Sequence, residues 1–171
     1  SLVGKESNDR IGSTVLALTS GNFITRSSSW NGNRGAVTFV NGSNGQLVDG
    51  SFAGEVSVSN SLVGSASGDK VGGGGFRLNN GNLVIPSLDW GSEGVSNQGK
   101  GAVTWMSGID GSLVTGQKAG EVSALNSVVG STKGDRVGLP TVNADTSNYL
   151  IRATNFIHNG NISAGAVLFV D

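Results

Sequence analysis

Large aromatic side chains recur in this sequence at one fixed position, and polar side chains surround each of them. Trp30, Trp90 and Phe156 follow three aspartates at the same spacing, with asparagine, aspartate or glutamate residues close by. A flat ring can stack on the apolar face of a sugar while amides and carboxylates bind its hydroxyl groups. The residues that the sequence offers for such a ligand-binding site are Trp30, Asn31, Asn33, Asp89, Trp90, Glu93, Phe156 and Asn159.

The same aromatic positions have a second interpretation, which is packing. A large aromatic that recurs in every repeat can fill the space between neighbouring sheets, and an indole buries well when its N–H finds an acceptor. We expect packing to be the main role of these residues, with ligand contact as the alternative. Trp105 and its equivalents Phe39 and Phe169 lie in apolar stretches, and we expect all three in the core.

The residue types needed for catalysis are sparse. General acid–base chemistry needs a group that titrates near neutral pH beside a substrate. The single histidine, His158, lies in a polar stretch with no counterpart elsewhere, which predicts a solvated loop residue. The serines lack the GxSxG pattern of a nucleophile elbow. We therefore predict no catalytic residue and no enzyme activity.

Three aspartates, Asp9, Asp69 and Asp135, also recur at one position of the repeat. The residue after each of them is a cation: Arg10, Lys70 and Arg136. Aspartate suits turns because its carboxylate accepts hydrogen bonds from nearby backbone N–H groups. We predict that these aspartates form turns and pair locally, and we expect no metal and no cofactor.

The composition narrows the class of protein. The chain has 171 residues with 29 glycines, only 13% charged residues and no cysteine, which is typical of short strands joined by tight turns. Without cysteine there is neither a disulfide framework nor a thiolate site. A formal net charge of −1 offers no basic surface for nucleic acid, and no stretch reaches the roughly 20 apolar residues of a membrane span. We expect neither nucleic-acid binding nor membrane insertion.

A threefold internal repeat positions all of these residues. SLVGKESNDRIG starts at Ser1, SLVGSASGDKVG at Ser61 and SVVGSTKGDRVG at Ser127. This predicts a single repeat domain, 1–171, with units 1–60, 61–126 and 127–171. The length varies only between the repeated aromatic and the next shared motif, which reads GAVTF, GAVTW or GAVLF. We expect a loop there.

Each unit reads as up to four short antiparallel strands, because apolar residues alternate or cluster over a few positions between Gly- and Asn-rich turns. The predicted strands are 13–18 and 74–78 for the first; 22–28, 82–87 and 148–154 for the second; 35–40, 101–106 and 165–170 for the third; and 55–64 and 121–130 for the fourth. The fold class is therefore all-β, with four-stranded units like propeller blades.

The order of GDRVG, a strand, NGN, a second strand and then GAV with an aromatic is similar to the FG-GAP repeats of integrin-α-type β-propellers. It resembles still more the FG-GAP-like tandem repeats of bacterial filamentous-haemagglutinin-type surface proteins. The resemblance implies blade-like units on a secreted or cell-surface bacterial protein. Calcium-binding blades of that family carry an acidic loop, but the matching segments here are 18–22, 78–82 and 144–148, in which only Asp145 is acidic. Calcium is therefore not carried over.

Two functions follow as expectations. The first is a non-enzymatic structural or adhesive module, and the alternative is a glycan-binding, lectin-like propeller with sites near Trp30, Trp90 and Phe156. Because propellers typically have four to eight blades, three blade-like units must be completed by other blades. We expect self-association, with a dimer closing a six-bladed ring as the favoured form and an array of repeats or a threefold barrel as alternatives.

Overall fold

The computed structural model describes residues 1–142 and 148–170. Their regular structure is almost entirely β, which confirms the all-β prediction. The strands of the first repeat are β1 (Leu2–Val3), β2 (Thr14–Ala17), β3 (Phe23–Ser27), β4 (Ala36–Val40) and β5 (Gly54–Glu55). A short turn, α1 (Trp30–Asn33), follows β3, and its backbone is left-handed at Asn31 and Gly32.

The second and third repeats follow the same order. The second contains β6 (Leu62–Val63), β7 (Phe76–Arg77), β8 (Leu83–Ser87), β9 (Ala102–Met106) and β10 (Gly120–Glu121). The third contains β11 (Ser127–Val129), β12 (Leu139–Val142), β13 (Tyr149–Ala153) and β14 (Ala166–Val170). In the part of the chain that is described, no helix has the length and apolar character needed to cross a bilayer.

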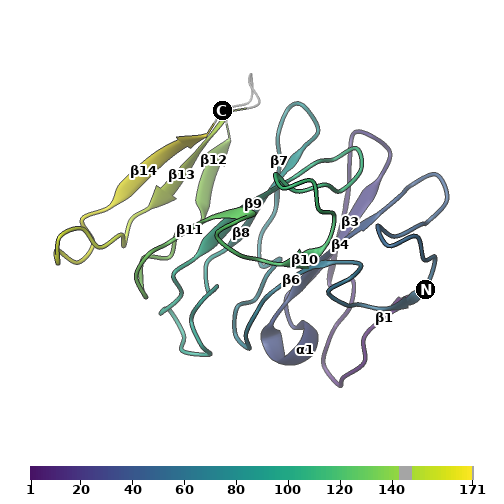
Figure 1. Ribbon diagram of the computed structural model, residues 1–171, viewed down its shortest axis with the longest axis horizontal. Helices are drawn as coiled ribbons and strands as arrows, with labels where there is room; N and C mark the ends of the chain where they lie inside the picture. The colour runs from purple at the N-terminus through teal and green to yellow at the C-terminus, as the bar shows by residue number, and fades with distance from the viewer. Residues whose placement is uncertain (143–147, 171) are drawn as a thin grey trace.

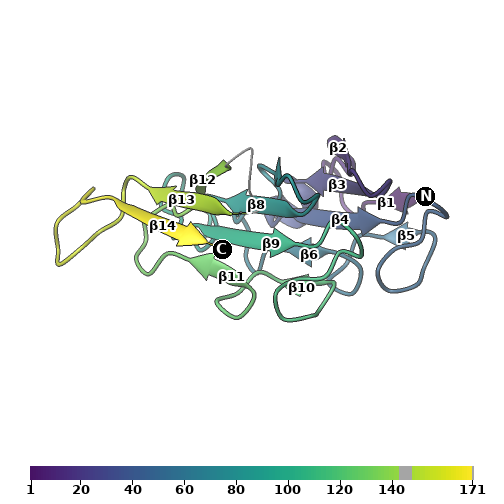
Figure 2. The same cartoon turned by 90° about the horizontal axis from the view of Figure 1, so that it is seen from above.

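The first and second sheets each take a fourth strand from the start of the next repeat. The first sheet runs β2-β3-β4-β6 with antiparallel neighbours, and β10 adds to β6 in parallel. The second sheet runs β7-β8-β9-β11, while the third has only β12-β13-β14. Figures 1 and 2 show the three sheets side by side in chain order, with β1 at one end of the molecule and β14 at the other.

The prediction of one continuous fourth strand over 55–64 is wrong. The structure has two short strands there, β5 and β6, with a turn between them. Asn60 causes the turn: its Oδ1 accepts a hydrogen bond from the Ser57 N–H at 2.9 Å and its Nδ2 donates to the Glu55 carbonyl at 2.9 Å. Asn126 makes the same bonds to Ser123 and Glu121, so the predicted strand 121–130 divides into β10 and β11 in the same way.

Neighbouring repeats meet through backbone hydrogen bonds. The Gly64 N–H donates to the Gly35 carbonyl at 3.1 Å, and the Val71 N–H donates to the Arg34 carbonyl at 3.0 Å. The second junction has the same bonds, from Gly130 to Gly101 and from Val137 to Lys100, each at 3.0 Å. Both junctions therefore use one geometry.

A glycine allows this close approach. Gly35 has a left-handed backbone with φ +77°, and a Cβ atom there would lie 2.3 Å from both the backbone N and the carbonyl O of Val71. Gly101, with φ +79°, lies in the same way against Val137. The glycine of the GAV motif is thus required by the neighbouring repeat as well as by its own turn.

Apolar side chains from adjacent sheets form the core between them. Ile24, Val37, Leu62, Leu83 and Ile85 are fully buried in one cluster that joins the first two sheets. A second cluster joins the second and third sheets and contains Val84, Val103, Val137, Tyr149 and Ile151. Each boundary between neighbouring sheets therefore has an apolar cluster of its own.

The prediction that the aromatic residues of the third strands are all in the core holds only in part. Phe39 is buried and Trp105 packs against a core cluster, but Phe169 is 60% exposed. The reason is that the second repeat packs against Phe39, with Gly111 beside its ring, whereas the described residues place no further repeat against β14.

Candidate functional site

The three repeated aspartates are buried and bind backbone N–H groups on both sides. Asp69 Oδ2 accepts hydrogen bonds from the Ser65 and Ala66 N–H groups at 2.8 and 2.9 Å, and its Oδ1 accepts from the Gly91 N–H at 2.9 Å. Asp9 and Asp135 do the same, with Asn31 and Ile157 in the place of Gly91. Each carboxylate thus fixes its own turn to the residue after the repeated aromatic, as the turn interpretation predicts.

The cations after the aspartates do not pair with them. Lys70 and Arg136 have left-handed backbone conformations, and both side chains turn toward Asp89. The Lys70 Nζ lies 3.1 Å from Asp89 Oδ2, and the Arg136 Nη2 lies 3.9 Å from Asp89 Oδ1. Because Arg136 belongs to the third repeat and Asp89 to the second, this charged group crosses a repeat boundary.

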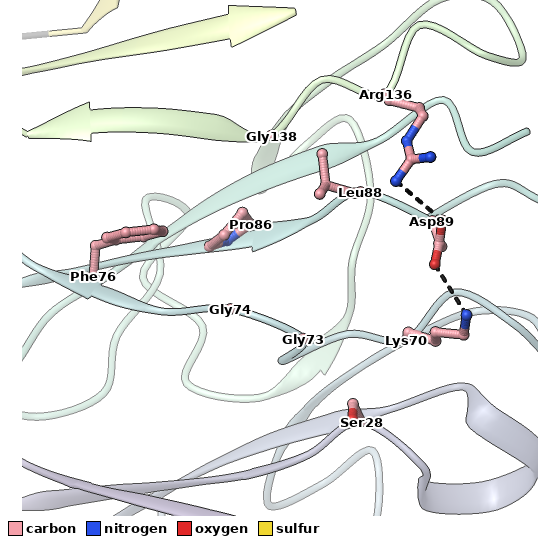
Figure 3. A pocket seen from close by; sticks show the side chains of 10 residues that line it. All are labelled: Ser28, Lys70, Gly73, Gly74, Phe76, Pro86, Leu88, Asp89, Arg136 and Gly138. Carbon is pink, nitrogen blue, oxygen red and sulfur yellow. Dashed lines mark hydrogen bonds and ion pairs between the residues drawn. The ribbon is translucent and has the colours of Figure 1, made fainter. Parts of the chain in front are cut away.

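A cleft of about 350 Å³ lies beside this charged group. Figure 3 shows Lys70 and Arg136 approaching Asp89 from opposite sides, with Leu88 and Pro86 lining the cleft. The other lining residues are Ser28, Gly73, Gly74, Phe76 and Gly138. The cleft thus combines an apolar wall with one carboxylate and two cations, a combination suited to a small polar ligand with an apolar face.

A second hollow of about 260 Å³ shares Lys70 and Asp89 with the first. It lies against the variable loop of the second repeat, and its other lining residues are Asn33, Ser67, Gly68, Ser92, Gly94, Val95 and Ser96. Asp89 and Asn33, two of the predicted ligand residues, therefore lie at one site between the first and second repeats.

The family comparison matches the same repeat pattern. Residues 17–73 and 77–139 match the model of a family described as a repeat of unknown function, DUF5650. The chain belongs to this repeat family. No curated protein matches the chain. Each matched stretch of the DUF5650 repeat starts at the last residue of one first strand and runs past the strand that begins the next repeat. It therefore contains β3, β4 and β6 of the first sheet, or β8, β9 and β11 of the second.

The repeated aromatics of the DUF5650 repeats pack into the structure. Trp30 is 7% exposed, and the Arg34 guanidinium lies 5.7 Å from the centre of its ring. Trp90 and Phe156 are partly buried and pack against two different core clusters. The three rings therefore lie in separate places, and their packing role has clear support, whereas ligand contact stays a prediction.

The polar residues of the predicted site lie around these rings. The Asn31 N–H donates to Asp9, and Asn31 and Asn33 have left-handed backbones that shape the first variable loop. Glu93 is exposed and bonds the Lys133 Nζ at 2.6 Å, and this hydrogen bond lowers the pKa of Glu93. Asn159 is exposed, with its side-chain amide 3.2 Å from His158 Nε2.

His158 lies in an exposed turn, in agreement with the loop prediction. Asp145 lies outside the described residues. Among the residues that are described, no group of three or more His, Asp or Glu side chains is arranged to hold a metal ion.

Sequence reasoning missed Lys70 and Arg136 as members of the site. Their recurrence directly after Asp69 and Asp135 was a signal that could have found them. Their partner Asp89 was harder to place, because the equivalent residues of the other repeats are Ser29 and Asn155. The charged group exists only where the second repeat meets its neighbours.

The variable loops begin and end with the same hydrogen bond in every repeat. The Gly35 N–H donates to the Trp30 carbonyl at 3.0 Å, and the Gly101 N–H donates to the Trp90 carbonyl at 3.0 Å. The Gly165 N–H donates to Phe156 at 3.2 Å. This closing bond forms although the loops 31–34, 91–100 and 157–164 differ in length.

One carboxylate outside the cleft gives a pH prediction. Hydrogen bonds from the Ser107 hydroxyl and from Lys118 hold the pKa of Asp110 well below its usual value. Because the pKa of Asp110 is lower in the folded chain than the value of about 4 in the unfolded chain, its ionised carboxylate stabilises the fold at pH values above 4. This contribution is lost as the pH falls toward the folded-state pKa. Asp110→Asn should therefore cost up to about 1 kcal/mol at pH 7, because the Lys118 ion pair is solvent-exposed.

Urea unfolding of both proteins from pH 7 to pH 2 measures this difference. The difference between the two stabilities should be largest above pH 4 and should shrink as the pH falls from 4 toward 2. A difference that stays constant over the whole range would show that Asp110 acts by something other than its charge.

Proposed function

We propose that this chain is a non-enzymatic structural or adhesive repeat module of a secreted or cell-surface bacterial protein. The observation that carries the proposal is that the polar side chains that recur in each repeat form hydrogen bonds to the backbone or to one another, within and between repeats. The hydroxyls of Thr38 and Ser61 lie 2.6 Å apart in the interior, and Thr104 and Ser127 form the same pair in the next sheet. Groups committed in this way stiffen the chain.

The proposal includes a propeller-type arrangement of the sheets. Its support is the FG-GAP-like order of motifs, the four-stranded antiparallel sheets and the arrangement in which the strand that begins one repeat completes the sheet before it. Two chains of three blades would make a six-bladed ring, which lies within the usual range for propellers.

Hydrogen exchange in a denaturant series tests the structural role. If the repeats act as one stiff body, the amides of β3 and β8 should exchange through the same opening, with a common free energy and denaturant dependence. Separate openings of β3 and β8 would overturn the proposal, because the repeats would then behave as loosely linked units.

A second candidate function is glycan binding at the cleft beside Asp89, which residues of all three repeats line. The observation that favours it is the placement of Asp89 beside an apolar wall, next to the variable loop of the second repeat. A carboxylate can accept hydrogen bonds from sugar hydroxyls, while Pro86 and Leu88 can contact the apolar side of the ring.

A glycan array tests this second function. Asp89→Asn should weaken the binding of any captured glycan at least tenfold, whereas Asp49→Asn, at an exposed carboxylate outside the cleft, should leave it unchanged. Neither variant should unfold the chain, because Asp49 is exposed and the Lys70 side chain that pairs with the partly buried Asp89 is half-exposed, and such ion pairs contribute little to stability. No binding across the array, or equal binding by both variants, would contradict glycan recognition at this site.

A further inference from the structure

The outer edge of the third sheet is uncovered although its sequence is that of an internal strand. Val167 and Phe169 of β14 are 66% and 60% exposed, whereas the equivalent Val37 and Phe39 of β4 are 0% and 5% exposed. The difference arises because β6 pairs with Val37 and Gly111 lies against Phe39, both from the next repeat, and the described residues offer no such neighbours to β14. An exposed apolar edge strand is a template for another strand.

The backbone beside β14 already has the conformation of a junction. Gly165 has φ +77°, the same as Gly35 and within a few degrees of Gly101. Val71 fills the space beside Gly35, but the equivalent space beside Gly165 is open. The atom nearest to a Cβ built on Gly165 is the Thr154 carbonyl oxygen, at 3.8 Å. Within the described part of the chain, the carbonyls of Ala164 and Gly165 accept no hydrogen bond.

The first repeat carries the matching donors. Gly4 and Ile11 are equivalent to Gly64 and Val71, whose N–H groups bind the preceding repeat. Among the hydrogen bonds of the described residues, none uses the Gly4 or Ile11 N–H. Strand β1 pairs with β5 on one side only, whereas its equivalent β6 has β10 on one side and β4 on the other.

We propose that β14 of one chain binds β1 of a second copy, head to tail, with the geometry of the internal junctions. The register follows from Ala36↔Val63 and Val37↔Leu62, which predicts Ala166 opposite Val3 and Val167 opposite Leu2. The two strands lie at opposite ends of the molecule (Figures 1 and 2), so the partner strand comes from another chain. The inference rests on the proposed structural function and names its partner.

The apolar side chains of β14 gain contacts in this arrangement. Phe39 packs against Gly111 of the next repeat, where a Cβ would lie 2.8 Å from the ring. The equivalent pair across the chain-to-chain contact is Phe169 and Gly45, and nothing lies within 4 Å of a Cβ built on Gly45. The partner thus has room for the exposed ring.

Light scattering behind a sizing column tests the association. The molar mass should rise above 17.2 kDa with concentration, to twice that value for a closed pair or further for an open array. Gly165→Ala should remove the association, because its Cβ would occupy the space of the partner's Ile11 backbone. Gly116→Ala is the matched control, with φ +81° and no neighbour within 4 Å, and should still associate. A monomer at all concentrations, or loss of association in both variants, would overturn the proposal.

Cysteine cross-linking tests the register, and the chain has no cysteine of its own to interfere. Val3 is exposed and Ala166 is partly exposed, so both positions can be replaced in the folded chain. A tagged Val3→Cys chain mixed with an Ala166→Cys chain should form a mixed disulfide under mild oxidation. A Val167→Cys chain, one position out of register, should form at least fivefold less. Equal yields would contradict the predicted pairing.

These outcomes are separate from the test of the structural function. Failure to associate would leave the shared exchange of β3 and β8 unchanged. Independent opening of β3 and β8 would reject the stiff module even if the chains still cross-linked. The two proposals therefore fail on different measurements.

Discussion

Gly101→Ala should lower the free energy of unfolding by about 4 kcal/mol and the melting temperature by about 10 °C. The added Cβ would lie 2.2 Å from the Val137 carbonyl O and 2.3 Å from its backbone N. Both atoms belong to the main chain of the next repeat and cannot move aside without breaking the junction. The left-handed conformation at φ +79° adds a cost of about 1 kcal/mol for any residue with a side chain.

Gly165→Ala separates these two causes. Gly165 has the same left-handed backbone, with φ +77°, but no atom lies within 3.4 Å of an added Cβ. Its cost should therefore be limited to about 1 kcal/mol. Thermal unfolding by circular dichroism, on dilute monomeric samples, compares the two variants. Similar losses in both would mean that the junction is less tightly packed than its geometry indicates.

Asp69→Asn should destabilise the chain by about 3 kcal/mol, although the substitution hardly changes the volume of the side chain. Asp69 is fully buried, and its two oxygens accept hydrogen bonds from the N–H groups of Ser65, Ala66 and Gly91. Asparagine replaces one oxygen with an NH₂ group, which then faces a donor in either orientation. A buried donor without an acceptor costs about 1–3 kcal/mol, and the loss of a charged acceptor adds to this.

Asp49→Asn is the control for Asp69→Asn. Asp49 also accepts hydrogen bonds from a backbone N–H and a hydroxyl, both of Ser51, but it is exposed. Water can replace these bonds, so the change should cost less than about 1 kcal/mol. Urea unfolding gives both values, and faster amide exchange at Gly91 should accompany only Asp69→Asn. Equal costs would show that burial of Asp69 does not matter.

Much of the fold could be predicted from the sequence because the three repeats can be aligned, and a strand or turn predicted in one is expected at the same place in the others. The second and third strands lie where alternating apolar residues and Gly/Asn turns placed them, and the aspartate turns bind backbone as expected. The division of segment 55–64 was missed because Val56, Val58, Leu62 and Val63 give it a strand-like apolar pattern, whereas the hydrogen bonds around Asn60 end β5.

The candidate site was predictable only in part. Asp89 was predicted as a ligand residue because it lies beside Trp90, but its two cations, Lys70 and Arg136, come from turns far from it in the chain. Their meeting depends on how adjacent repeats pack. The exposure of Phe169 also could not be predicted from its residue type, which is that of a core position. It is exposed because no neighbouring repeat packs against β14 among the described residues.

The constant closing bond of the variable loops has a consequence for what the surface can display. Trp30 and Gly35, and likewise Trp90 and Gly101, hold the two ends of each loop in one geometry whatever lies between them. The entropy of closing a loop grows only with the logarithm of its length. A foreign peptide grafted between Trp90 and Gly101 would therefore be carried on an unaltered scaffold, and each copy of the repeat can present a different segment to the surroundings.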